Sequence, residues 1–155
     1  MLHHHPHSVT NQLQAAAWLW LSMVVVIALF SVIVSGFLWY LADRSRAYPH
    51  VEQLGYLSAL AGAMGAKWFP KSGIISRRFD FSREESCLKA YRQAFIVGMA
   101  IAECGALMLL VSMLLSQMLL PAILFFVLPL WTMISLRPSH KAFEIFCKWH
   151  KERLA

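Results

Sequence analysis

The sequence predicts an all-α integral membrane protein with three transmembrane helices, its N-terminus outside and its C-terminus in the cytoplasm. Three observations favour this fold class. Hydrophobic residues make up 59% of the 155 residues and charged residues 14%, against about 45–50% and about 25% in soluble domains. Three apolar runs are long enough to be spans, and the Lys and Arg residues avoid them. A soluble globule of this length has too little interior to bury so much apolar surface.

The first predicted span covers residues 15–42, which contain no charged side chain. A transmembrane helix needs only about 20 apolar residues. Aromatic side chains that are typical of the two membrane interfaces mark its ends, Trp18 and Trp20 at one, Trp39 and Tyr40 at the other. Residues 1–14 are then an external, His-rich tail.

Residues 43–92 are predicted to form a basic cytoplasmic loop. Its apolar segment, residues 54–66, has about 13 residues and is too short to span. We expect a helix there that is either interfacial or re-entrant, and the sequence leaves both open. Three glycines would let this helix pack closely: Gly55, Gly62 and Gly65.

The second and third predicted spans cover residues 93–115 and 118–136. The polar connection between them is very short, which favours an antiparallel helical hairpin. Ser82 and Glu85 form a capping box, so a helix should start near residue 83 and run unbroken into the second span. That helix would extend about 15 Å into the cytoplasm.

The distribution of positive charge gives the orientation. Nine Lys and Arg residues lie in 43–92 and five in 137–155, whereas 1–14 and the 116–117 turn have none. The positive-inside rule therefore places the loop and the tail in the cytoplasm. For a bacterial protein, the membrane would be the cytoplasmic (inner) membrane.

Residues 139–155 are predicted to form a basic amphipathic helix. Apolar side chains such as Ile145 and Phe146 share one face, and lysines occupy much of the rest. Such a helix lies on an anionic leaflet, either as a simple anchor or as a docking element. The candidate membrane-surface residues are Lys141, Lys148, Trp149, Lys151 and Arg153.

Glu103 lies near the middle of the second span. An ionised carboxylate at mid-bilayer costs about 2.5–3.5 kcal/mol even on mild scales. Protonation removes that cost, and a polar partner on another helix reduces it. Glu103 is therefore predicted to be a proton-binding group or an interhelical polar contact.

A stripe of small residues runs beside Glu103 on the same helix. Small side chains spaced four apart let membrane helices approach closely. The stripe could pack against identical copies, against a larger partner, or against the first span, which offers Ser31, Ser35 and Gly36. The stripe residues are Ala94, Gly98, Ala102 and Ala106.

The segment from Phe95 to Glu103, FIVGMAIAE, resembles the ion-binding second helix of the c subunit, or proteolipid, of rotary ATP synthases. The resemblance covers residues 94–115, about a seventh of the chain. It implies that Glu103 carries a proton and that the small residues pack neighbouring copies side by side.

No catalytic constellation stands out: there is no Ser-His-Asp arrangement, glycine-rich phosphate loop or zinc motif. We predict no enzyme, no cofactor, no nucleic-acid partner and no small-molecule substrate. The cysteines have no ligand spacing and are expected to be three free thiols, Cys87, Cys104 and Cys147. The only metal candidates are weak, and a flexible tail is favoured for them: His3, His4, His5 and His7.

These features favour a small non-catalytic membrane subunit of a larger secretion, transport or respiratory complex. Its partners would be the lipid bilayer and other membrane subunits, as a homo- or hetero-oligomer. The first alternative is a proton-translocating proteolipid that uses Glu103. The second is a membrane assembly factor.

Overall fold

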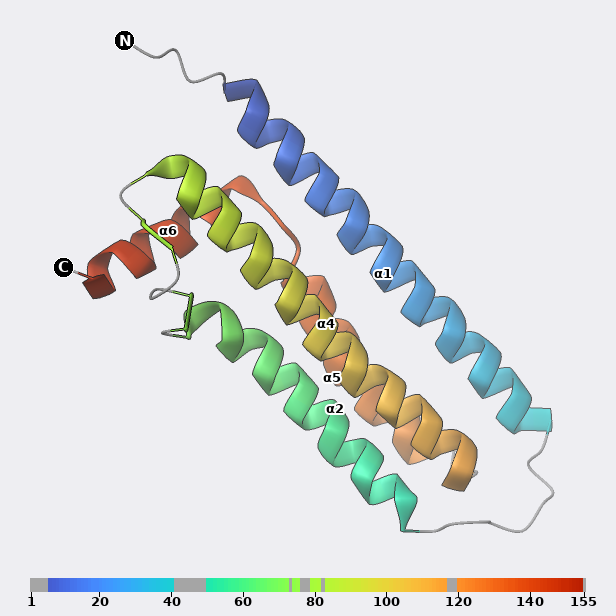
Figure 1. Cartoon of the computed structure of the whole chain (residues 1–155). Helices are drawn as coiled ribbons and strands as arrows, with labels where there is room; N and C mark the ends of the chain where they lie inside the picture. The colour runs from blue at the N-terminus through green and yellow to red at the C-terminus, as the bar shows by residue number, and fades with distance from the viewer. Residues whose placement is uncertain are drawn as a thin grey trace.

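The computed structural model describes residues 6–40, 50–72, 74–75, 79–81, 83–116 and 120–154. Within these ranges all the regular elements are helical. Four helices lie side by side and a fifth crosses one end of them (Figure 1). They are α1 (Pro6–Tyr40), α2 (Val51–Trp68), α4 (Glu84–Ser116), α5 (Leu120–Ser135) and the crossing helix α6 (His140–Leu154), with a 3-10 turn η1 (Phe69–Lys71) after α2.

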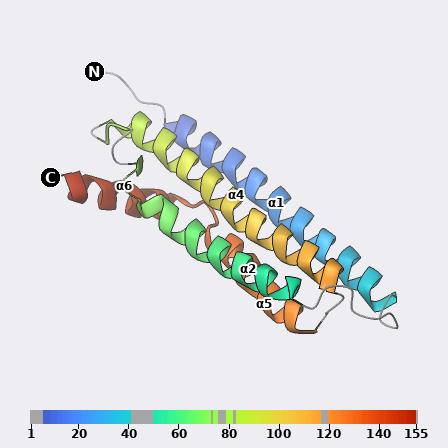
Figure 2. The same cartoon turned by 60° about the horizontal axis from the view of Figure 1, so that its bottom comes forward.

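Neighbouring helices alternate in direction along the chain, so that α1 and α4 run one way and α2 and α5 the other (Figures 1 and 2). Leu13, early in α1, packs on the cluster that contains Tyr91, early in α4. The Trp20 indole donates a hydrogen bond of 2.7 Å to the carbonyl oxygen of Met133, late in α5. Three spans with an external N-terminus would require α1 and α4 to be antiparallel. The structure corrects that expectation, because α2 carries the chain back along the bundle.

Helix α2 is longer than the expected interfacial or re-entrant segment 54–66. It has 18 residues and lies lengthwise against α4. A Cβ atom on Gly62 would come within 2.9 Å of the Gly105 Cα, so the two backbones nearly touch there. Gly55 and Gly65 also face α4, next to Ser112 and Ile101. Small residues on both helices allow this approach, which is why the segment packs along the bundle rather than across its end.

Helix α4 is one unbroken helix of 33 residues that starts at Glu84, as the predicted start near residue 83 required. Its first turn carries an ion pair of 3.0 Å between Glu85 and Lys89. Ser82, the expected cap, lies outside the described residues. Glu84–Ser116 is long and apolar enough to cross a membrane. How much of it would project beyond a bilayer stays a prediction.

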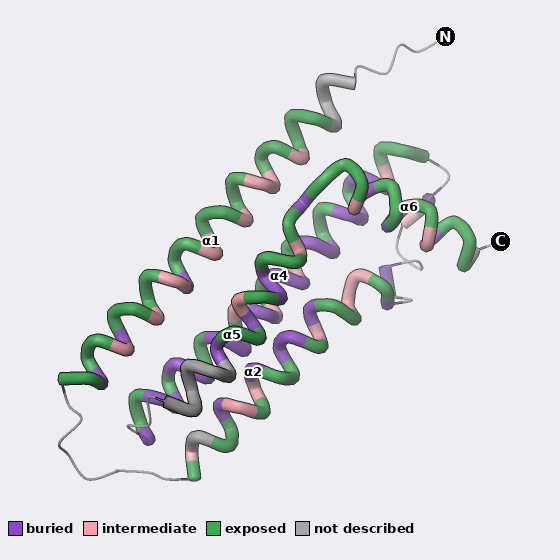
Figure 3. The backbone as a smooth tube through the Cα atoms, turned by 180° about the vertical axis from the view of Figure 1, so that it is seen from behind, coloured by how far each residue is buried: buried purple, intermediate pink, exposed green. Residues whose placement is uncertain are grey.

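Helix α1 is attached to the bundle along one narrow stripe. Its buried side chains are Ile27, Val34 and Leu38, and most of its remaining surface is exposed (Figure 3). The helix begins well before the predicted residue 15 and ends at Tyr40. By length and composition, Thr10–Tyr40 is the second described segment that could cross a membrane. The third predicted span corresponds to α5, an apolar helix of 16 residues.

Candidate functional site: Glu103 and the basic end of the bundle

Glu103 lies on a flank of α4, about 20 Å along the helix from Ser116. Its side chain is partly exposed. Among the described residues, no hydrogen bond or ion pair reaches its carboxylate. The carboxyl group of Glu103 therefore has no polar partner in the described part of this chain.

The stripe of small residues is buried within the chain. Ala94, Ala102 and Ala106 are at most 1% exposed. A Cβ on Gly98 would lie 3.2 Å from the carbonyl oxygen of Ala66, on α2. The first span was the alternative partner for the stripe. Its Gly36 makes no such contact, because nothing lies within 4 Å of its Cβ position. The stripe thus contributes to the contact with α2.

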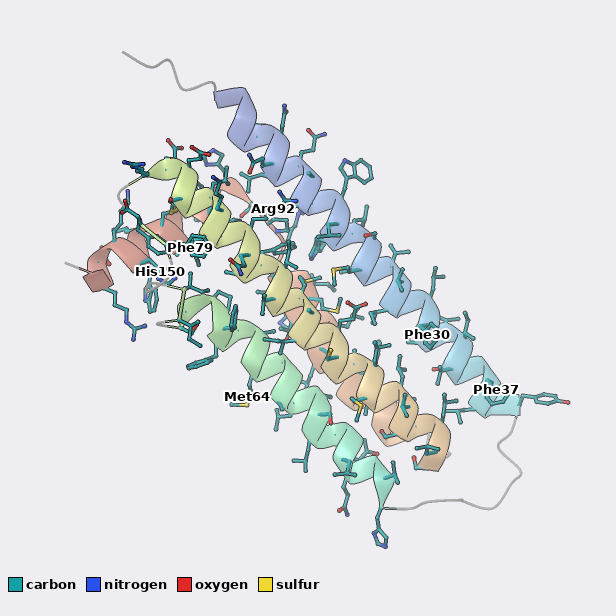
Figure 4. The ribbon with its side chains drawn as sticks, viewed as in Figure 1. Phe30, Phe37, Met64, Phe79, Arg92 and His150 are labelled. Carbon is teal, nitrogen blue, oxygen red and sulfur yellow. A yellow bond between two sulfur atoms is a disulfide. The ribbon has the colours of Figure 1, made fainter. Side chains whose placement is uncertain are left out.

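A second apolar cluster closes the end of the bundle where α4 starts and α6 crosses. We call this region, which also carries the basic residues of η1 and α6, the basic end. Aromatic rings from separate segments meet in it: Tyr91 lies edge-on to Phe143 and Phe146, at centroid distances of 5.5 Å and 5.4 Å. Phe81 stacks on His150 at 4.7 Å. Figure 4 shows Phe79 and His150 together where α6 lies against the bundle, with Arg92 nearby on α4.

Two side chains of α6 hold it to the turn after α2. His150 donates from Nε2 to the carbonyl oxygen of Pro70 at 2.9 Å, and Arg153 donates from Nη1 to that of Lys71 at 3.0 Å. Burial lowers the pKa of the His150 imidazole, whereas the hydrogen bond to Pro70 acts in the opposite direction. The carbonyl groups at the C-terminal end of a helix commonly accept hydrogen bonds from Arg and His side chains.

A disulfide links Cys87 on α4 to Cys147 on α6, with their Cα atoms 6.1 Å apart. The expectation of three free thiols was therefore wrong for two of them, and Cys104 is free and exposed. The two bonded cysteines are 60 residues apart in sequence. Only the packing of α6 on α4 brings them together, so no local spacing in the sequence signals the pair.

The structure separates the predicted membrane-surface residues of α6 into two groups. Three lysines are exposed: Lys141, Lys148 and Lys151. Trp149 is half-buried, and the Arg153 guanidinium lies 5.2 Å from the centre of its ring. The apolar side of the helix is only partly available to lipid, because Phe143 and Phe146 are buried against the bundle while Ile145 is 59% exposed.

No group of three or more His, Cys, Asp or Glu side chains within the described ranges is arranged to hold a metal ion. The weak candidates His3, His4 and His5 lie outside the described residues, as does the side chain of His7. The sequence did not predict four contacting residues: the disulfide pair Cys87 and Cys147, His150 with its hydrogen bond to Pro70, and Trp20 with its hydrogen bond to Met133.

Comparison of the chain with protein-family models, with characterised proteins and with solved structures finds no match.

Proposed function

We propose that this chain is a small, non-catalytic membrane subunit of a larger membrane complex, as in secretion, transport or respiratory machinery. The observation that carries the proposal is Glu103, a partly exposed carboxylate in an apolar helix with no partner among the described residues. Such a group costs several kcal/mol in lipid, about 2.5–3.5 on the mildest scale. A polar group on another subunit would lower that cost. The exposed apolar surface of α1 is available for lipid or for the same partner.

Two variants test the role of Glu103. The tagged chain is extracted in a mild detergent, and the native mass and composition of its complex are measured. Glu103→Gln keeps a polar group and is expected to retain the complex, whereas Glu103→Leu is expected to release the other subunits. Glu85→Leu, at the exposed start of the same helix, is the matched control. A homogeneous monomer from the unaltered chain, or equal release by the control, would contradict the proposal.

The topology that accompanies this proposal differs from the sequence-based one. We infer that α1 and α4 cross the bilayer in the same direction, that α2 and α5 return the chain, and that both ends of the chain are cytoplasmic. The parallel course of α1 and α4 supports this. Charge supports it too, because residues 67–92 and 137–153 hold twelve Lys and Arg, against two in the connection between α1 and α2.

The cysteine pair provides a test of this topology in cells. Cytoplasmic thiols are kept reduced, so Cys87 and Cys147 should react with a thiol reagent in rapidly quenched cells and should pair after extraction. A disulfide that is already present in quenched cells would place the basic end on the oxidising side. Labelling of the N-terminus and the C-terminus from opposite sides of the membrane would contradict the shared location of the two ends.

The proteolipid and assembly-factor alternatives stay predictions. Gly98, within the stripe that would pack neighbouring copies in a ring, already contacts Ala66 of α2, and this contact does not favour the proteolipid. The native mass of the complex distinguishes these alternatives. A closed ring of identical copies would support the proteolipid, and the substitution Glu103→Gln should then abolish ion flux. A transient association with an incomplete complex would support an assembly factor.

A further inference from the structure

A cavity of about 390 Å³ opens at the basic end, between α4, η1, the end of α5 and α6. Its walls are mainly apolar and aromatic, and include Tyr91, Phe95, Leu136 and Trp149. Its volume lies within the range of ligand pockets, about 300–1,000 Å³. The two hydrogen bonds from α6 to η1 hold the helix that forms one wall.

Two cations, Lys71 and Arg137, also line this cavity. Both side chains are exposed, and neither has a carboxylate partner among the described residues. The ion pairs of the described chain lie elsewhere, on the first turn of α4 and along α6. The Arg137 guanidinium rests 5.8 Å from the centre of the Trp20 ring, which fixes where this charge lies. The cavity therefore combines an apolar interior with two uncompensated positive charges.

The position of the cavity along the bundle matches the interfacial level of a bilayer. Trp18 and Trp39 are 21 residues apart on α1, which corresponds to about 32 Å of helix, close to the hydrocarbon thickness of about 30 Å. Trp20, about 3 Å inside this limit, contacts both Met133 and Arg137. A molecule in the cavity would thus have its polar part at the headgroup level and its apolar part in the bundle.

We propose that this cavity binds one anionic phospholipid of the surrounding leaflet. Lys71 and Arg137 contact the phosphate, and the first part of an acyl chain lies against the aromatic walls. Basic pockets between membrane helices bind anionic headgroups in this way, and the planar guanidinium suits a phosphate in particular. A free phosphate would leave the apolar walls unused. Phosphatidylcholine also carries a phosphate, but its trimethylammonium group would place a further positive charge beside Lys71 and Arg137, so a lipid with net negative charge is preferred. The inference rests on the membrane placement proposed above.

The test is a lipid titration of the full-length purified protein, followed by native mass spectrometry in a mild detergent. Phosphatidylglycerol and phosphatidylcholine with the same acyl chains are compared. The unaltered protein should bind phosphatidylglycerol at least tenfold more tightly. The double variant Lys71→Ala/Arg137→Ala should lose this preference, because each charge-assisted contact contributes about tenfold in affinity. The control, Lys89→Ala/Arg92→Ala, removes the same charge at the same end without touching the cavity and should keep it.

Further variants and ligands separate the possible outcomes. Ala142→Trp keeps both cations but fills the cavity, and it should abolish the preference while the helical circular dichroism is unchanged. Equal loss in the control would indicate a general surface-charge effect and would overturn the proposal, as would full binding by Ala142→Trp. Displacement of the lipid by millimolar inorganic phosphate would indicate a site for a free anion. Flotation with vesicles tests the membrane placement separately. If the protein floats but shows no lipid preference, only the lipid site in the cavity is refuted. If the protein does not float, the membrane placement is refuted.

Discussion

Gly62 on α2 lies directly against the backbone of Gly105 on α4, so one added methyl group at this position should weaken the contact between the two helices. In Gly62→Ala the new Cβ would lie 2.9 Å from the Gly105 Cα and 3.1 Å from the Ile101 carbonyl oxygen. Both neighbours are backbone atoms, so they cannot move aside as a flexible side chain would. The helices must separate, and overpacking of this kind costs about 1–3 kcal/mol.

Gly36→Ala on α1 is the matched control, because nothing lies within 4 Å of its Cβ position. Both substitutions gain about 1 kcal/mol of helix propensity, so the difference between the two variants isolates the contact. At about 2–4 °C per kcal/mol, Gly62→Ala should melt about 2–12 °C below Gly36→Ala in thermal unfolding in detergent. Equal melting temperatures, or a more stable Gly62→Ala, would mean that α2 and α4 do not meet at these glycines.

Three further changes report on how the basic end and α1 are held. In the oxidised protein, the double variant Cys87→Ser/Cys147→Ser should lower the free energy of unfolding by about 4 kcal/mol, because it removes the entropic effect of closing a 60-residue loop. An equal loss under reducing conditions would contradict this explanation. Burial lowers the pKa of His150, so the unfolded chain binds a proton at this imidazole at a higher pH than the folded chain does. The free energy of unfolding should therefore be highest above pH 6.5 and should fall as the pH drops below that value. His150→Phe should remove this dependence of the free energy of unfolding on pH, as measured by denaturant titrations at several pH values. Trp20→Phe, which removes a hydrogen bond to α5, should cost about 1 kcal/mol in the same titrations, whereas Trp18→Phe, at an exposed side chain, should cost little.

Several helices could be predicted from the sequence because their signals are local. The uncharged run from residue 15 predicts α1, and the capping box of Ser82 and Glu85 predicts that α4 starts near residue 83. The small-residue stripe predicts a close helix contact. None of these signals identifies α2 as the partner of the stripe, because the contact joins Gly98 to Ala66, which lies much earlier in the chain.

That this chain is helical, apolar and basic at defined positions can be predicted from its sequence alone. These properties follow from helix propensity and transfer free energy, which each short segment carries alone. Helix packing determines three further features: α1 runs parallel to α4, Cys87 meets Cys147, and a cavity with two cations opens beside α6. These features depend on contacts between residues that are far apart in the chain. A single packing choice, the return of α2 along α4, reverses the predicted direction of α1 relative to α4 without changing any local pattern.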